Sequence, residues 1–166
     1  MAQTIGKELN YGFAGNFARN PDAIITTRPN GSTENILFGS ALIYDTSGNV
    51  IPADATTTMD NFAGIAAFQM KSALDYQNQG KGGEYAPMEA VSVFQRGSIS
   101  VICKDGTPAQ NGEVFIYTTA SGTMNVGDFT ADSAALGTVQ IENAQWGTAA
   151  DPNGITELVL LTRANA

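Results

Sequence analysis

The 166-residue sequence contains no histidine and only one cysteine. Without histidine the chain lacks Ser-His and Cys-His catalytic pairs, His-ligated zinc, and the side chain that most often serves as a general base near neutral pH. The single cysteine, Cys103, has no partner for a disulfide within the chain and is too little for a zinc site. We therefore expect no enzymatic activity, no metal and no cofactor.

Charged residues are also scarce, at 14% of the chain, and the net charge is −8. Acidic surfaces repel polyanions, whereas nucleic-acid binding needs a basic face that releases counterions, so we expect no nucleic-acid partner. The charge is uneven. Residues 1–31 carry three basic and two acidic side chains, a net +1, which leaves five basic against fourteen acidic side chains, a net −9, for the remainder.

Long hydrophobic runs are missing as well. No stretch approaches the roughly 20 apolar residues of a membrane-spanning helix, and residues 1–10 have no apolar core typical of a signal peptide. We expect no membrane partner and no export signal. A lone cysteine agrees with assembly in a reducing cytoplasm.

Turn signals and short apolar segments are frequent. Pairs such as Asn30-Gly31, Asp105-Gly106 and Asn111-Gly112 favour tight turns. The segments between the turns alternate or run apolar over strand lengths, which predicts a mostly β domain, a compact barrel or sandwich. The expected strands lie at residues 36–44, 91–94, 98–103, 114–118, 136–141 and 155–161.

Two segments need a closer reading. Residues 55–70 fit either a helical stripe or one face of a strand, and Gly64 favours the strand. In residues 98–103, alternation places Val101 and Cys103 towards the core and the two serines on a largely wet face. We therefore predict that Cys103 is a buried apolar residue rather than a nucleophile.

Other chemical candidates have simpler structural readings. Trp146 could stack on a sugar, but a lone tryptophan beside a β segment more often anchors a core or an interface. Asp45 begins a segment that superficially resembles a calcium loop, yet a hairpin turn fits it better. Carboxylate pairs such as Asp54 with Asp60, or Glu84 with Glu89, have no feature that sets a catalytic separation.

The N-terminal segment differs from the rest. Around residues 11–21 aromatic side chains alternate irregularly with Gly, Asn and Pro, so we predict an extended arm over residues 1–31 and a β-barrel domain over residues 32–166. Exposed aromatic side chains on such an arm would need a partner surface. The alternative is that the arm packs back on its own barrel. At the other end, residues 158–161 are apolar on both faces, which suits either the middle of the fold or a subunit interface.

Four short segments, in this order along the chain, carry a family resemblance. They are residues 11–15 (Tyr-Gly-Phe-Ala-Gly), 38–42 (Phe-Gly-Ser-Ala-Leu), 62–66 (Phe-Ala-Gly-Ile-Ala) and 96–101 (Arg-Gly-Ser-Ile-Ser-Val). Together they resemble the virion structural proteins of tailed phages. The chain is similar, from about residue 11 to residue 161, to capsid-decorating proteins whose fold is a small β-barrel called a β-tulip. Those proteins typically sit as trimers where capsomers meet.

The resemblance implies a cement protein on the outer surface of the virion. It would bind the major capsid protein after the shell expands, bridge neighbouring subunits, and resist the pressure of packaged DNA. The alternative is a receptor- or carbohydrate-binding module of a head or tail fibre. For the cement, we predict self-association as a homotrimer through Leu158 and Leu160. The capsid-binding residues would be those of the arm, because aromatic and arginine side chains dominate interfaces: Tyr11, Phe13, Phe17, Arg19 and Arg28.

Overall fold

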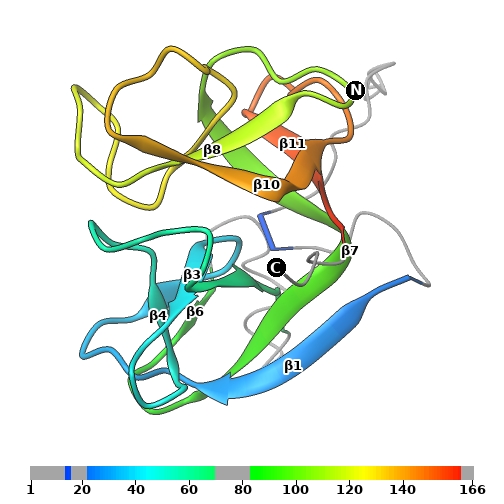
Figure 1. The fold of residues 1–166 in the computed structure, drawn as a ribbon. Helices are drawn as coiled ribbons and strands as arrows, with labels where there is room; N and C mark the ends of the chain where they lie inside the picture. The colour runs from blue at the N-terminus through cyan, green and yellow to red at the C-terminus, as the bar shows by residue number, and fades with distance from the viewer. Residues whose placement is uncertain (1–13, 16–21, 70–82, 162–166) are drawn as a thin grey trace, which may run out of the picture.

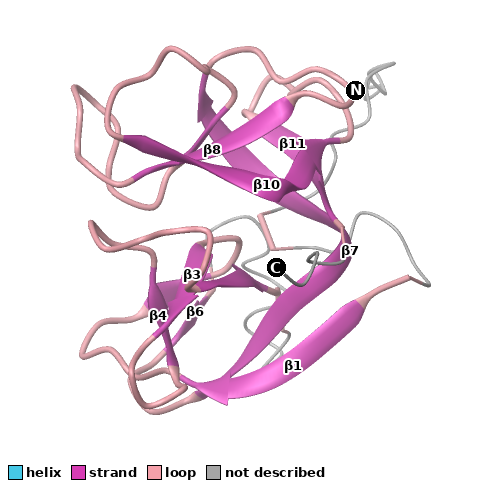
Figure 2. Ribbon diagram, viewed as in Figure 1, coloured by secondary structure: helices cyan, strands magenta, loops and turns pink. Residues whose placement is uncertain are grey.

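The computed structural model describes residues 14–15, 22–69 and 83–161. Within these residues the chain forms strands and turns and no helix (Figure 2). None of them belongs to a helix that could cross a membrane. The strands group into an upper and a lower part, and the long strand β7 runs through both (Figure 1).

Eleven strands follow one another within the described residues. They are β1 (Ile24–Pro29), β2 (Ile36–Leu37), β3 (Ala41–Tyr44), β4 (Val50–Pro52), β5 (Phe62–Ala66), β6 (Glu84–Tyr85), β7 (Ala90–Asp105), β8 (Glu113–Tyr117), β9 (Phe129–Thr130), β10 (Thr138–Trp146) and β11 (Ile155–Leu160).

The upper part is a closed five-stranded barrel. Its strands pair in the order β7, β11, β10, β8 and β9, and β9 returns to β7 in parallel to complete the ring. The other pairs are antiparallel. Closure leaves no open edge within the ring, which removes the free backbone groups of an edge strand.

The lower part is a sheet built on the first half of β7. On one side β7 pairs with β5, which continues to β3 and β4, and on the other side β7 pairs with β1. The short strands β2 and β6 form a separate pair beside this sheet. Asn30 links the end of β1 to this pair, because its buried side-chain amide donates to the carbonyl oxygens of Glu34 and Ala86 at 2.9 and 3.1 Å.

Strand β7 changes partners at one step. Arg96 pairs with Ile24 of β1, and the next residue, Gly97, pairs with Leu160 of β11. Gly97 has a φ of 109°, and a Cβ there would lie 2.5 Å from the carbonyl oxygen of Asp22. A glycine is therefore required where β7 leaves the lower sheet and enters the barrel.

Two hydrophobic clusters stabilise the two parts. The larger one fills the barrel and extends below it, with Phe94, Ile99, Val101, Trp146 and Leu158 among its members. The smaller one lies between the lower sheet and the β2–β6 pair. In it the ring of Phe38 meets that of Tyr85 edge to face, with 5.0 Å between centroids, and the Tyr85 hydroxyl donates to the Ala67 carbonyl at 2.7 Å.

The structure confirms the predicted mostly β class and the small β-barrel. The ambiguous residues 55–70 contain a strand, β5, as Gly64 suggested. Four details differ from the sequence-based expectations. The segment 36–44 is divided into two strands, β2 and β3. The segments 91–94 and 98–103 are one continuous strand, β7. The predicted segment 136–141 begins too early, since β10 starts at Thr138 and Leu136 is 88% exposed. The serine face is not uniformly wet, because Ser100 is 1% exposed.

Strands β1, β4, β6 and β9 were not predicted at all. Each is short or lacks a buried face long enough to show a clear alternation, so periodicity alone does not reveal it. β1, β6 and β9 are positioned by pairing with strands that are distant in sequence, and β4 by its hairpin with β3.

Candidate functional site

The predicted arm is described only in part. Tyr11, Phe13, Phe17 and Arg19 lie outside the described residues, so their assignment to capsid binding stays a prediction. Arg28 is described: it lies on β1, is exposed, and its guanidinium carbon is 5.9 Å from the centroid of the Tyr44 ring. This cation–π contact orients the side chain along the surface of the lower sheet.

One short piece of the arm contacts the body. Gly15 donates its N–H to the carbonyl oxygen of Ser100 at 2.8 Å, and its own carbonyl oxygen accepts from the N–H of Phe68 at 2.7 Å. Residues 14–15 therefore bridge β7 and the segment that follows β5. The arm is held to its own body at this point, whatever the flanking aromatic side chains contact.

Strand β1 has six residues, lies within the predicted arm, and forms an edge of the lower sheet. β1 pairs with β7 over Ile24–Pro29, and none of the described strands pairs with its other side. Its side chains are mostly exposed, including Ile24 at 47% and Ile25 at 41%. An exposed apolar edge strand is a template for pairing with another chain, so β1 is the described segment best suited to hold a partner.

Leu158 and Leu160, predicted to mediate self-association, lie inside the protein's own core. They are 1% and 2% exposed and belong to the cluster that fills the barrel. Their side chains do not reach the surface on which a second subunit would dock. Of the two readings of this segment, the structure shows the middle of the fold, and self-association of the protein stays a prediction without these two contacts.

Trp146 is a core anchor. It is 0% exposed and belongs to the barrel cluster, and its indole N–H has no hydrogen-bond partner among the residues that the structure describes. A fully buried ring offers no face to a sugar, so the carbohydrate-binding alternative loses its stacking residue. The polar, glycine-rich residues 77–83 would form the other part of such a site, and residues 77–82 of this segment lie outside the described residues.

The potential catalytic groups have structural roles. Cys103 is 8% exposed, and burial raises the pKa of its thiol, which disfavours the nucleophilic thiolate. Asp54 accepts from the N–H of Thr56 at 2.7 Å, and Glu89 accepts from the N–H of Ala86 at 2.8 Å, so both carboxylates stabilise turns. Among the described residues no three acidic or cysteine side chains form a metal site.

The Asp45 segment is a hairpin turn, as predicted. Its carboxylate accepts from the N–H groups of Ser47 and Asn49 at 2.8 and 2.9 Å. Burial opposes the charged form, but the hydrogen bonds from Asn49, Ser47 and Gly48 lower the pKa of Asp45 below its usual value. The oxygen atoms that superficially suggested a calcium ligand are used within the turn.

Glu157 has an unusual position that sequence patterns did not reveal. It lies on β11 between buried neighbours and is only 5% exposed. A single acidic residue within a mostly apolar strand was the available signal, because buried carboxylates are rare without a specific environment.

Comparison with known proteins gives the chain a family. A family model described as structural cement protein, represented by E217 gp24 and Pam3 gp6, matches residues 1–161. The chain belongs to this structural cement protein family. The match spans the arm and the barrel together, so both parts are features of the family's sequence pattern.

A solved structure supports the same fold. The chain is similar to a chain from the structure entitled "The capsid of Myoviridae Phage XM1", with a TM-score of 0.73 and 17% sequence identity. The alignment covers 98% of this chain and 99% of the other. At this identity the similarity demonstrates the shared fold. Among curated proteins, no relative matches the sequence.

Proposed function

We propose that this protein binds the outer surface of a phage capsid and cements neighbouring major capsid subunits against the pressure of packaged DNA. Membership of the structural cement family over residues 1–161 carries the proposal. The protein would reside on the virion after assembly in the host cytoplasm. It acts as a structural component and not as an enzyme, in keeping with the buried thiol and the turn-bound carboxylates.

The structure supplies features that a cement needs. The barrel is closed, and β1 presents an open edge with two exposed isoleucines to which a shell subunit can add a strand. The arm residues Tyr11, Phe13, Phe17 and Arg19 would extend this contact to a second subunit. Many such contacts on one lattice act together, so each copy can bind weakly while the decorated shell gains strength.

Charge favours a protein partner over the packaged DNA. The chain carries eight basic and sixteen acidic side chains, a net charge of −8. Such a surface repels nucleic acid and is complementary to a basic protein surface. The acidic body would therefore face basic regions of the shell.

Co-sedimentation tests the proposal. Purified protein is mixed with undecorated expanded shells and, as a control, with unexpanded shells. We expect saturable binding at a fixed number of copies per shell, and only to the expanded form. Failure to sediment with either form, at any protein concentration up to solubility, would contradict the proposed function. Chemical cross-linking of the decorated shells tests the proposed homotrimer, for which cross-linked trimers are expected.

A further inference from the structure

Met88 is an exposed apolar residue held in an unfavourable backbone conformation. It lies between β6 and β7, its side chain is 79% exposed, and its φ is 63°. Residues with a side chain are strained at such φ values, and asparagine tolerates them best. Leu136 is comparably exposed, at 88%, but its φ is not positive. Within the described residues, only Met88 combines an exposed large apolar side chain with this backbone strain.

Hydrogen bonds within the turn fix the position of Met88. The N–H of Glu89 donates to the carbonyl oxygen of Ala86 at 3.1 Å, which closes a four-residue turn with Pro87 and Met88 at its centre. The Glu89 carboxylate accepts from the N–H of Ala86 at 2.8 Å. Proline followed by a residue of positive φ is the arrangement of a type II turn, in which the second central position usually holds glycine or asparagine. Here that position holds a methionine.

The buried residue Asn30 fixes the same turn from the body of the protein. Its carbonyl oxygen accepts from the N–H of Met88 at 3.0 Å, and its own N–H donates to the carbonyl oxygen of Glu89 at 2.8 Å. Its side-chain amide donates to the carbonyl oxygen of Ala86 at 3.1 Å. Because Asn30 is 0% exposed, these bonds tie the turn to the interior. Met88 is therefore preorganised, and little backbone freedom remains to be lost when a partner binds it.

The described fold gives the Met88 side chain no packing role. The side chain belongs to neither hydrophobic cluster. Its bond to Asn30 comes from the backbone N–H, which any residue other than proline would supply. Strained residues persist where the surrounding structure holds them in place, and they cluster at binding sites. The methionine therefore points to a contact with another molecule.

Met88 lies at the end of the open edge of β1. Asn30, to which Met88 donates, directly follows Pro29, the last residue of β1. Because the N–H of Asn30 donates on the β7 side, to Glu89, the backbone groups of Pro29 face the free side of the strand. Proline has no N–H, so backbone pairing along this edge ends at Pro29. A subunit that adds a strand to β1 reaches Met88 where that pairing stops.

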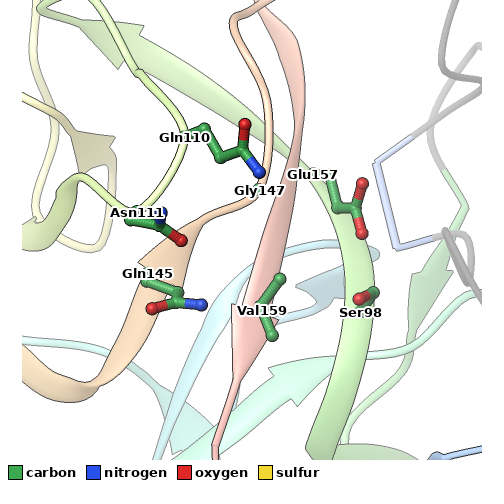
Figure 3. A pocket seen from close by; sticks show the side chains of 7 residues that line it. All are labelled: Ser98, Gln110, Asn111, Gln145, Gly147, Glu157 and Val159. Atoms are coloured by element: carbon green, nitrogen blue, oxygen red, sulfur yellow. The ribbon is translucent and has the colours of Figure 1, made fainter.

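The pocket on the outer face of the barrel does not suit a methionine side chain. Its volume is about 170 Å³ (Figure 3). Apart from Gly147 and Val159, its lining is polar and consists of Ser98, Gln110, Asn111, Gln145 and Glu157. A thioether is stabilised by burial against apolar atoms, which these walls do not provide. A second copy of the chain is thus a poor partner for Met88 at this pocket, and we expect the recess on a different protein.

We propose that Met88 is an anchor that inserts into an apolar recess of the major capsid protein, next to the strand that this protein adds to β1. The inference rests on the proposed capsid-binding function and names one of its contacts. The unbranched thioether adapts to a recess of irregular shape, and the fixed turn holds it in position. The methionine lowers the stability of the free protein and raises its affinity for the shell.

Met88→Asn tests the proposal, and Leu136→Asn is a matched control that removes a comparably exposed apolar side chain from the barrel. Asparagine tolerates a positive φ, so Met88→Asn should raise the melting temperature by about 2 °C. It should also weaken binding to expanded shells, measured by co-sedimentation, by about tenfold or more, whereas Leu136→Asn should weaken it by about twofold or less. Met88→Leu keeps an apolar side chain and should bind within about threefold of the parent.

Three outcomes of this comparison would overturn the proposal. The first is binding of Met88→Asn at parental affinity. The second is an equal loss in Leu136→Asn, which would show that only the general hydrophobicity of the surface matters. The third is a lower melting temperature of Met88→Asn, which would show that the methionine stabilises the fold.

Oxidation by hydrogen peroxide tests the contact without a variant. Peroxide transfers one oxygen atom to the thioether sulfur, which gives methionine sulfoxide and water. In the free protein the exposed Met88 should oxidise rapidly, and on decorated shells its rate, followed by mass spectrometry, should fall by about tenfold or more. Met124, on the loop between β8 and β9, serves as an internal reference whose rate should not change. An unchanged rate for Met88 on the shell would overturn the anchor.

The two proposals fail in different ways. A parent protein that sediments with expanded shells, with Met88→Asn binding equally well, removes the anchor and leaves the cement function intact. A parent protein that binds no shells overturns both. If the free parent self-associates while Met88→Asn is monomeric and binds shells as the parent does, the recess lies on a second copy, and its assignment to the capsid protein is overturned.

Discussion

Gly15 and Gly39 pack backbone against backbone, and both have positive φ angles, 85° and 79°. A Cβ on Gly15 would lie 2.9 Å from the Gly39 nitrogen, and a Cβ on Gly39 would lie 2.7 Å from the Cβ of Ala14. The two glycines belong to two of the four segments that carry the family resemblance. These two segments therefore bring the arm close to the body, at the point where Gly15 bridges Ser100 and Phe68.

Gly39→Ala tests this close approach, and Gly48→Ala is a matched control. Both glycines have a φ of 79°, but a Cβ at Gly48 would meet no atom within 4 Å. We expect Gly48→Ala to cost about 1 kcal/mol of unfolding free energy through backbone strain alone, and Gly39→Ala about 2 kcal/mol more because of the overlap with Ala14. Denaturant unfolding measures both. Equal losses would show that the contact imposes no constraint.

Val101→Asp tests the inward face of β7. Val101 is 0% exposed within the barrel core, whereas its neighbour Ile102 is 36% exposed on the opposite face. Burying an unpaired carboxylate should cost more than about 3 kcal/mol, and Ile102→Asp should cost about 1 kcal/mol or less. A Val101→Asp protein with the parent's unfolding curve would contradict the assigned face.

Cys103 provides a chemical test of the same core. Because burial raises the pKa of its thiol, we expect thiol reagents to label the native protein slowly and the unfolded protein rapidly. The folded-state pKa is the higher one, so the stabilisation is present below the unfolded pKa of about 8.5 and is lost as the pH rises through the folded value. Cys103→Ala should lack this alkaline loss. Fast labelling of the native protein would show an exposed thiol.

Asp45 should make the hairpin turn sensitive to acid. Its pKa is lowered in the folded protein, so its stabilisation is present above the unfolded pKa of about 3.9 and is lost as the pH falls through the lower, folded value. Asp45→Ala should lower the melting temperature at neutral pH, and its difference from the parent should shrink in acid. Melting curves recorded between neutral and acidic pH check this. A constant difference across that range would exclude the carboxylate as the cause.

The arm prediction is best tested without removing Gly15, because Gly15 holds the arm to the body. We expect a variant with Ala at positions 11, 13, 17 and 19 to keep the parent's melting temperature and lose most of its binding to expanded shells. Interface aromatic and arginine side chains typically contribute about 2 kcal/mol or more each when central to a contact. Unfolding of the variant would instead show that the arm completes the core, and binding at parental affinity would refute its role as a staple.

Much of the barrel follows from local sequence patterns. Three such patterns each extend over a few residues, so they can be recognised without tertiary information. They are the alternation around Val101 and Cys103, the apolar segment before Leu160, and turn pairs such as Asn111-Gly112. The absence of histidine likewise excluded whole classes of catalytic site from composition alone. The sequence also placed Trp146 correctly as an anchor, because a large aromatic ring in a β segment is most stable when buried.

Pairing between distant segments decided the rest. Three features depend on contacts between residues far apart in the sequence, which no local hydrophobic periodicity reveals. They are the edge position of β1, the change of pairing partner at Gly97, and the closure of the barrel by the parallel strand β9. The same holds for Leu158 and Leu160, whose apolar pattern suited an interface or a core until the neighbours of β11 were known. Composition and alternation thus determined the class of the protein, and the tertiary structure alone determined which surfaces are open to a partner, because exposure is a property of the packed chain and not of any single segment.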